Sequence, residues 1–135
     1  MADKIFIDAT GASIGRIASY AAKQALQGAK VFVVNSENAI ITGNKKVAIE
    51  KWKERRAKGG SALKGPYHSK DSEKILKRAI RGMLPDYRLG RGRDAWKRIR
   101  CFNDVPEEYK EEELVKLKTK TLIKHINLKE LKKKL

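Results

Sequence analysis

The sequence predicts a single α/β domain over residues 1–135, with a parallel sheet covered by helices and with basic loop and helix extensions. Two short apolar runs, residues 4–8 and 31–35, flank a segment with helical spacing, which is the order of a β-α-β unit. The second run is apolar on both faces, as expected for a parallel sheet covered by helices. The length of 135 residues, 41% of them hydrophobic, fits one domain with a modest core.

The N-terminal third supplies the predicted β-α-β unit. Residues 4–8 are expected to form a buried strand, and Gly11 and Gly15 mark the turn after it. Gly28 suits the end of the helix, and residues 39–42 are expected to form a third, short strand. The helix itself is predicted from apolar side chains that follow helical spacing, namely Ile14, Ile17, Ala18, Ala21, Ala22, Ala25 and Leu26.

The middle of the chain is predicted to hold two further helices, over residues 45–57 and 72–83. A loop is expected over residues 58–66, because glycine and proline break regular structure. Ser72 is expected to cap the second of these helices, and Pro85 is expected to end it. One side of that helix is apolar, and the other carries Lys74, Lys77, Arg78 and Arg81 at helical spacing.

The remainder of the chain changes character twice. Residues 87–100 are basic and interrupted by glycine, and residues 99–102 are expected to form the last strand. The part beyond, residues 103–135, is balanced in charge and is predicted to be helical. Within it, Asn127 and Glu130 have the spacing of a capping box at the start of a helix.

The composition also bounds the setting of the protein. Cys101 is the one cysteine, so an internal disulfide is excluded and a reducing compartment is favoured. Its apolar neighbours predict a buried, inert thiol. No apolar run approaches the roughly 20 residues that cross a bilayer, and the N-terminus lacks a basic stretch followed by an apolar one. A cytoplasmic protein that does not enter membranes is therefore expected.

Positive charge is concentrated in the middle of the chain. The formal net charge is +16, and residues 44–102 hold 19 Lys and Arg against 6 Asp and Glu. Residues 1–43 and 103–135 contribute only +1 and +2. A dense basic region favours binding to a polyanion, since neutralising nucleic-acid phosphates releases their counterions.

The sequence gives weaker evidence for an enzyme than for a protein that binds a polyanion. The glycine-rich turn over residues 8–15 follows a strand, where dinucleotide-binding folds cradle phosphate, but such a turn also serves tight helix–strand packing. A nucleotide-dependent enzyme therefore stays the alternative. His68, His125 and Cys101 show no metal-ligand spacing. We expect no enzyme activity, no cofactor, no metal and no small-molecule substrate.

The basic pattern recurs in three neighbouring elements, each of which alone could be a solvated surface. Arginine binds phosphate bidentately, and aromatic rings stack on unpaired bases. Neither a zinc finger nor a basic region leading into leucine heptads is present, which favours structured RNA over a DNA operator. The residues predicted to bind RNA are Arg55, Arg56, Lys58, Lys64, His68, Lys74, Lys77, Arg78, Arg81, Arg88, Arg91, Arg93, Trp96, Lys97 and Arg98.

Several of these segments form recognisable motifs in a fixed order. Arg81-Gly-Met-Leu-Pro85, then Leu89-Gly-Arg91 and residues 99–102, resemble the signature of the thirteenth large-subunit ribosomal protein family. The Gly-Arg-Ile-Ala-Ser run at residues 15–19 and the pair Thr42-Gly43 are similar to the N-terminal half of that family.

Two further segments indicate the archaeal branch. Gly65-Pro-Tyr-His68 resembles the Arg-Gly-Pro-x-His element of archaeal and eukaryotic members, with Lys64 where arginine is usual. Residues 104–109 differ from the His-Pro-His-like element that bacterial members usually carry after the last strand.

The resemblance implies a three-layer α/β/α fold around a small, mostly parallel four-stranded sheet, and a structural role in the large subunit of the cytoplasmic ribosome. It also implies direct binding to large-subunit ribosomal RNA, a part in early assembly, and contacts with neighbouring ribosomal proteins. A non-ribosomal RNA chaperone or assembly factor shares the basic surface and stays open as a third interpretation. Stoichiometric presence in mature subunits would separate it from a structural component.

Overall fold

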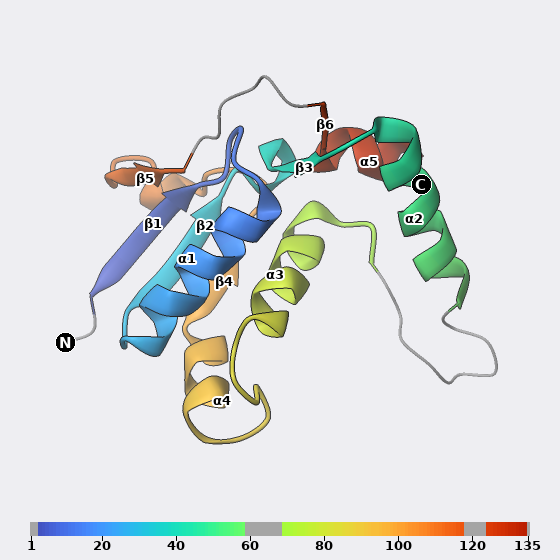
Figure 1. Cartoon of the computed structure of the whole chain (residues 1–135). Coiled ribbons are helices and arrows are strands. Elements are labelled where there is room, and N and C mark those ends of the chain that lie inside the picture. The colour runs from blue at the N-terminus through green and yellow to red at the C-terminus, as the bar shows by residue number, and fades with distance from the viewer. Residues whose placement is uncertain (1–2, 59–68, 118–123, 135) are drawn as a thin grey trace.

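The computed structural model describes residues 3–58, 69–117 and 124–134, and packs helices against a central parallel sheet (Figure 1). The predicted α/β class is confirmed. In chain order the elements are β1 (Lys4–Asp8), α1 (Ile14–Leu26), β2 (Lys30–Val34), the 3-10 turn η1 (Ser36–Asn38), β3 (Ile40–Thr42), α2 (Lys45–Lys58), α3 (Ser72–Gly82), α4 (Gly90–Lys97), β4 (Ile99–Cys101), the 3-10 turn η3 (Glu107–Tyr109), β5 (Leu114–Lys116), β6 (His125–Asn127) and α5 (Leu128–Lys134).

The central sheet has four strands in the order β4-β2-β1-β5, and each neighbouring pair is parallel. This confirms the predicted small parallel sheet. The third strand expected from the sequence forms as β3, but it leaves the central sheet. It pairs antiparallel with β6, with Ile41 opposite Ile126. The segment just before α2 is therefore joined to the C-terminal part of the chain.

One face of the central sheet packs against α1 and its neighbour α3 (Figure 1). The face of α1 toward the core is largely alanine, and such small side chains let a helix approach a sheet closely. Ile7, Val31 and Ile99 are fully buried there, together with Leu76 and Ile80 of α3. Burying each large aliphatic side chain stabilises the fold by about 1.5–3 kcal/mol.

The opposite face of the sheet carries an aromatic group. Phe6 and Phe32 stack at 5.0 Å between ring centroids, and the ring of Tyr109 lies 5.0 Å from each of them. Phe102 lies nearly parallel to Phe32 at 6.5 Å. Because Tyr109 ends the turn η3, the layer on this face is thin and consists of a short turn with its rings.

The turn after β1 is tied to the end of β2. Asp8 Oδ1 accepts hydrogen bonds from the backbone N–H of Thr10, at 3.0 Å, and from Asn35 Nδ2, at 3.1 Å. Partial burial opposes ionisation of Asp8, but these hydrogen bonds outweigh it and hold the pKa of its carboxyl below the ordinary value. Gly11, at φ +70°, donates its N–H to the carbonyl of Asn38. The glycine-rich turn thus has a structural role.

The prediction that residues 103–135 are helical is wrong over two segments, which form β5 and β6. The Glu- and Lys-rich sequence favours a helix locally, but the free edge of β1 offers unpaired backbone groups, and β5 pairs with it. Only α5 is an α-helix there among the described residues. The predicted cap of α5 is confirmed, since Glu130 N–H donates to Asn127 Oδ1 at 2.7 Å.

The start of α3 also differs from expectation. Asp71, not Ser72, occupies the N-cap position, and Ser72 is a buried residue of the first turn. The side chain that satisfies this helix end comes from beyond β4, because Glu73 N–H donates to Asn103 Oδ1 at 3.1 Å. A long-range contact has replaced the local cap that the sequence suggested.

Helix α4 lies in the stretch that the sequence marked only as basic and rich in glycine. It forms because Gly92 packs directly on the backbone of Pro85 and Asp86, where a Cβ would collide with both carbonyl oxygens. Ala95 of the same helix is fully buried. Close packing has therefore overridden the low helix propensity of glycine.

Candidate nucleic-acid interface

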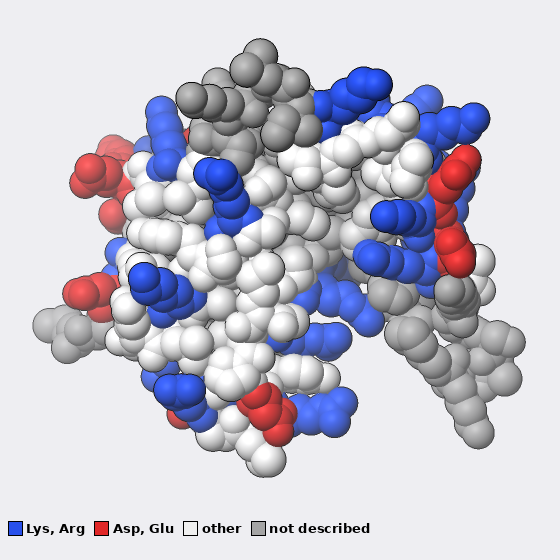
Figure 2. Space-filling model, viewed as in Figure 1, with Lys and Arg blue, Asp and Glu red and all other residues white. Residues whose placement is uncertain are grey.

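Helix α3 and strand β4 border a cationic hollow of about 490 Å³, which we call the α3 hollow. Side chains of α3 form one wall, and the rest comes from α4, β4, Phe102 just after β4, and Ser69 before α3. Figure 2 shows Lys and Arg side chains gathered around the recess beside α3. The lining residues are Ser69, Glu73, Lys74, Lys77, Arg78, Arg81, Trp96, Arg100, Cys101 and Phe102.

A second hollow, of about 540 Å³, opens beside the strand starts, and we call it the sheet hollow. It is lined by Lys4, Lys30, Phe32, Asp94, Lys97, Arg98, Arg100 and Tyr109. Arg100 lines both hollows. Since β4 is an edge strand, the basic surface continues from one hollow to the other around that edge.

Sequence reasoning missed three of these cations. Arg100 lies exposed between Ile99 and Cys101 in a strand whose side chains alternate in direction, and that alternation is the signal that could have found it. Lys4 and Lys30 begin β1 and β2, outside the basic middle of the chain. Only the parallel register, which places these two lysines side by side, brings them to the sheet hollow.

Two of the predicted RNA-binding residues hold the fold together. Lys77 Nζ donates to the backbone carbonyl of Ile99 at 2.8 Å and lies 4.6 Å from the ring centroid of Trp96. Burial lowers the pKa of Lys77. Arg98 Nη1 donates to the carbonyl of Ala25 at 2.9 Å, in the last turn of α1, where a cation also offsets the helix dipole.

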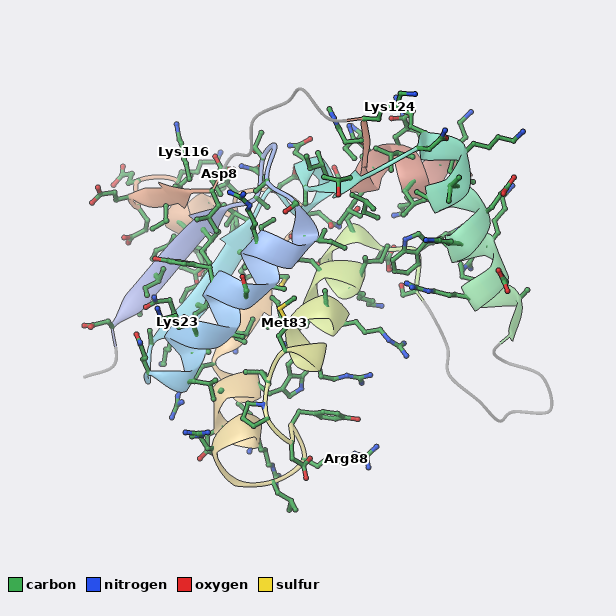
Figure 3. The ribbon with its side chains drawn as sticks, viewed as in Figure 1. Asp8, Lys23, Met83, Arg88, Lys116 and Lys124 are labelled. Carbon is green, nitrogen blue, oxygen red and sulfur yellow. The ribbon has the colours of Figure 1, made fainter. Side chains whose placement is uncertain are left out.

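Trp96, which was predicted to bind RNA, and its neighbour Tyr87 both carry cations of the protein itself. Arg81 lies 4.7 Å and Arg88 5.3 Å from the ring centroid of Tyr87. The ring of Trp96 faces the ammonium group of Lys77, and its centroid lies 6.4 Å from that of Tyr87. Figure 3 shows Arg88 directed outward from the segment between α3 and α4. The ring of Tyr87 therefore positions Arg81 and Arg88 beside the hollow, whereas the ring of Trp96 helps to hold Lys77 within the fold.

Other predicted residues lie apart from the two hollows. Arg55 and Arg56 belong to α2, which projects from the body of the molecule (Figure 1). Arg55 lies 5.2 Å from the ring centroid of Trp52 on the same helix. Lys58 is the last residue of α2, and Arg91 and Arg93 are exposed on α4. Lys64 and His68 lie outside the described residues.

The structure offers little that resembles a reactive centre. Cys101 is half-buried rather than fully buried, because β4 is an edge strand, and burial raises the pKa of its thiol to about 12. Within residues 3–58, 69–117 and 124–134, no group of three or more His, Cys, Asp or Glu side chains could hold a metal ion. In the same ranges no helix is both long and apolar enough to span a membrane.

Comparison with known proteins decides the family. The family model described as ribosomal protein L13 matches residues 2–108, which include both hollow-lining helices and the glycine-rich turn. The chain belongs to the ribosomal protein L13 family. The resemblance inferred from the sequence motifs is confirmed.

The three curated relatives described here come from archaea, the branch that the sequence motifs indicated. The chain is 45% identical over 122 residues to the large ribosomal subunit protein uL13 of Archaeoglobus fulgidus, covering 90% of this chain and 77% of the relative. It is 44% identical over 110 residues to that of Methanosarcina barkeri, with 81% and 77% covered. The protein of the same name from Thermoplasma acidophilum is 43% identical over 111 residues, with 82% and 80% covered.

Membership of the L13 family bears on the alternatives left open by the sequence. A ribosomal protein is a structural, non-enzymatic component, so the expected lack of enzyme activity is confirmed by the family. The family also agrees with the expected place in the cytoplasmic ribosome. The glycine-rich turn, already engaged in hydrogen bonds of the fold, belongs to the matched region.

Proposed function

We propose that this L13-family protein is a structural constituent of the large ribosomal subunit that binds large-subunit ribosomal RNA directly. The observation that carries the proposal is the place of Arg100, where two basic hollows meet around the edge strand β4. Lys and Arg side chains on both sides of this strand suit a surface that holds phosphates from two RNA segments.

The mechanism is electrostatic bridging on a rigid frame. Two RNA segments repel each other through their phosphates, and cations fixed between them lower that repulsion and release counterions. The buried contacts of β4, α3 and α4 keep the cations in place before RNA arrives. Arg81 and Arg88 are further held by the ring of Tyr87, so less side-chain entropy is lost on binding.

An assembly role follows from the same bridging. A protein that holds two RNA segments together favours their folded arrangement over the open one, by as much as it binds the folded arrangement more tightly. Neighbouring ribosomal proteins are proposed to meet residues 103–117, where carboxylates outnumber lysines and exposed ones such as Glu107 and Glu108 disfavour contact with phosphates.

Competitive binding tests the proposal. The protein is titrated with large-subunit ribosomal RNA at several salt concentrations, with bulk transfer RNA and duplex DNA as competitors. Preference for the ribosomal RNA that persists as salt rises supports specific binding to a folded RNA. Equal binding to all three polyanions, lost steeply with salt, would leave a generic basic protein and favour the RNA-chaperone interpretation.

A further inference from the structure

The α3 hollow has a composition that phosphate binding alone does not require. Its rim is cationic, with Arg78, Arg81 and Arg100, but Trp96 and Phe102 contribute aromatic surface to its lining. A phosphate needs cations and backbone N–H groups, whereas an apolar lining suits a ring system. The volume of about 490 Å³ lies within the roughly 300–1,000 Å³ typical of pockets that hold small organic ligands.

Phe102 is fixed by its backbone as a platform. Its N–H donates to the carbonyl of Val33 at 2.7 Å, and its carbonyl accepts from the N–H of Ser36 at 3.0 Å. On one side its ring packs beside Phe32 and Tyr109. The residue is nevertheless only half-buried, and it lines the α3 hollow. A ring held in this way stacks on a ligand with little loss of conformational freedom.

We propose that the α3 hollow receives one unpaired nucleotide of the bound RNA, with the base against Phe102 and Trp96 and its phosphate at the cationic rim. The proposal rests on the RNA binding proposed above and names the RNA element that this site takes. Glu73, the one carboxylate that lines the hollow, provides an acceptor for the amino group of a base. Aromatic stacking on an unpaired base is tolerant of sequence, so every base type should enter.

The first test compares two RNA oligomers that differ only in their bases. One is hexaadenylate, and the other is an abasic hexamer with the same ribose-phosphate chain. At equal salt, hexaadenylate is expected to bind about fivefold or more tightly, since stacking of a base on an aromatic side chain contributes about 1–3 kcal/mol.

A matched pair of variants locates the effect. Phe102→Leu removes one of the two rings that line the hollow, and Phe6→Leu removes a ring of the same aromatic group away from the hollow. Phe102→Leu is expected to reduce the preference for hexaadenylate severalfold, because Trp96 alone is then left for stacking, and Phe6→Leu is expected to keep the full preference. Thermal unfolding of both variants shows that each one folds. An equal loss of preference in the two variants would overturn the assignment to this hollow.

A fluorescence measurement avoids any variant of the aromatic group. Trp52→Phe leaves Trp96 as the sole tryptophan, and Trp52 lies on α2 away from the hollow. Hexaadenylate is expected to quench the emission of Trp96, and the abasic hexamer is expected to quench it far less.

The outcomes separate this inference from the function it rests on. Equal affinity for the two hexamers, or an unchanged Trp96 emission, overturns the nucleotide pocket while RNA binding through phosphates stands. Binding to large-subunit RNA without binding to either hexamer overturns it as well, because the site must accept an unpaired nucleotide. Loss of binding to ribosomal RNA itself would instead overturn the proposed function.

Discussion

The ammonium group of Lys77 lies 2.8 Å from the carbonyl oxygen of Ile99 and covers the open edge of β4. An edge strand presents unpaired carbonyl and N–H groups, and a lysine placed over them satisfies one group and hinders pairing with another chain. The same ammonium faces the ring of Trp96, so it links α3, α4 and β4. Lys77, which the sequence analysis predicted to bind RNA, thus also stabilises the fold.

Replacing Lys77 is therefore expected to lower stability more than replacing its neighbour on α3. Lys77→Ala should reduce the free energy of unfolding by about 1–2 kcal/mol, because a charge-assisted hydrogen bond is removed. Lys74→Ala is the matched control, since Lys74 forms an exposed ion pair with Asp71 and should cost less than about 0.5 kcal/mol. Urea unfolding of both variants measures the difference, and equal losses would show that the hydrogen bond to Ile99 contributes little.

Gly92 is expected to tolerate no side chain. In Gly92→Ala the new Cβ meets the backbone oxygens of Pro85 and Asp86, so α4 must shift. Overpacking of this kind costs about 1–3 kcal/mol. Gly15→Ala on α1 is the control, because no atom lies within 4 Å of a Cβ there and alanine is expected to stabilise the helix by about 0.5–1 kcal/mol. Thermal unfolding should move in opposite directions for the two variants.

Asp71 is expected to make stability depend on acid pH. A hydrogen bond from Lys132, at 3.1 Å, with the charges of Lys132 and Lys74, holds the pKa of Asp71 below its ordinary value of 3.8. A carboxylate with a lowered folded-state pKa stabilises the protein above its unfolded-state pKa, and this contribution is lost as the pH falls through the folded-state value.

The Asp71→Asn variant tests this dependence. It should be less stable than the parent protein at neutral pH, and the difference should shrink as the pH falls below the ordinary pKa of 3.8. Unfolding by urea at a series of pH values gives both curves. Asp104→Asn, at another exposed carboxylate, is the control, and an equal effect from that variant would assign the dependence to overall charge.

Cations of both hollows are expected to contribute to the salt dependence of RNA binding. Replacing Arg78 and Arg100 together with alanine should weaken binding and reduce the slope of log affinity against log salt by about 0.7–0.9 for each phosphate that is no longer neutralised. Lys23→Ala is the control, since Lys23 is exposed on α1 and lies away from both hollows (Figure 3). A slope that stays unchanged in the double variant would mean that this surface faces solvent.

Local patterns predicted the N-terminal part of the fold well. The expected bounds of β1 and α1 match the structure, because apolar periodicity and the glycine at position 28 act within a few residues. Strands β5 and β6 were missed because each spans only three residues, too few for a periodic pattern, and partners far along the chain decide their conformation. Helix α4 was also missed, because Gly92 lowers helix propensity locally and its close packing on the backbone of Pro85 and Asp86 is visible only in the structure.

The candidate site was likewise predicted in part from local sequence. Charge counting found the basic region and most of the cations that line the two hollows. It could not distinguish Lys77 and Arg98, whose carbonyl partners lie 22 and 73 residues away, from cations that are presented to solvent. Lys4, Lys30 and Arg100 join the surface only through strand pairing, which composition does not reveal.

The contacts that hold the start of α2 determine when this helix can dock during synthesis of the chain. Gly43 N–H donates to the carbonyl of Lys124, and Lys45 at the start of α2 pairs with Glu130, 85 residues later in the chain. At about 5–20 residues per second, the partner of Lys45 is made roughly 4–17 s after it. During that interval β1, α1 and β2 can already pack, while α2 has yet to gain its anchor. Helix α2 is therefore expected to dock onto the rest of the protein later than β1, α1 and β2 pack together.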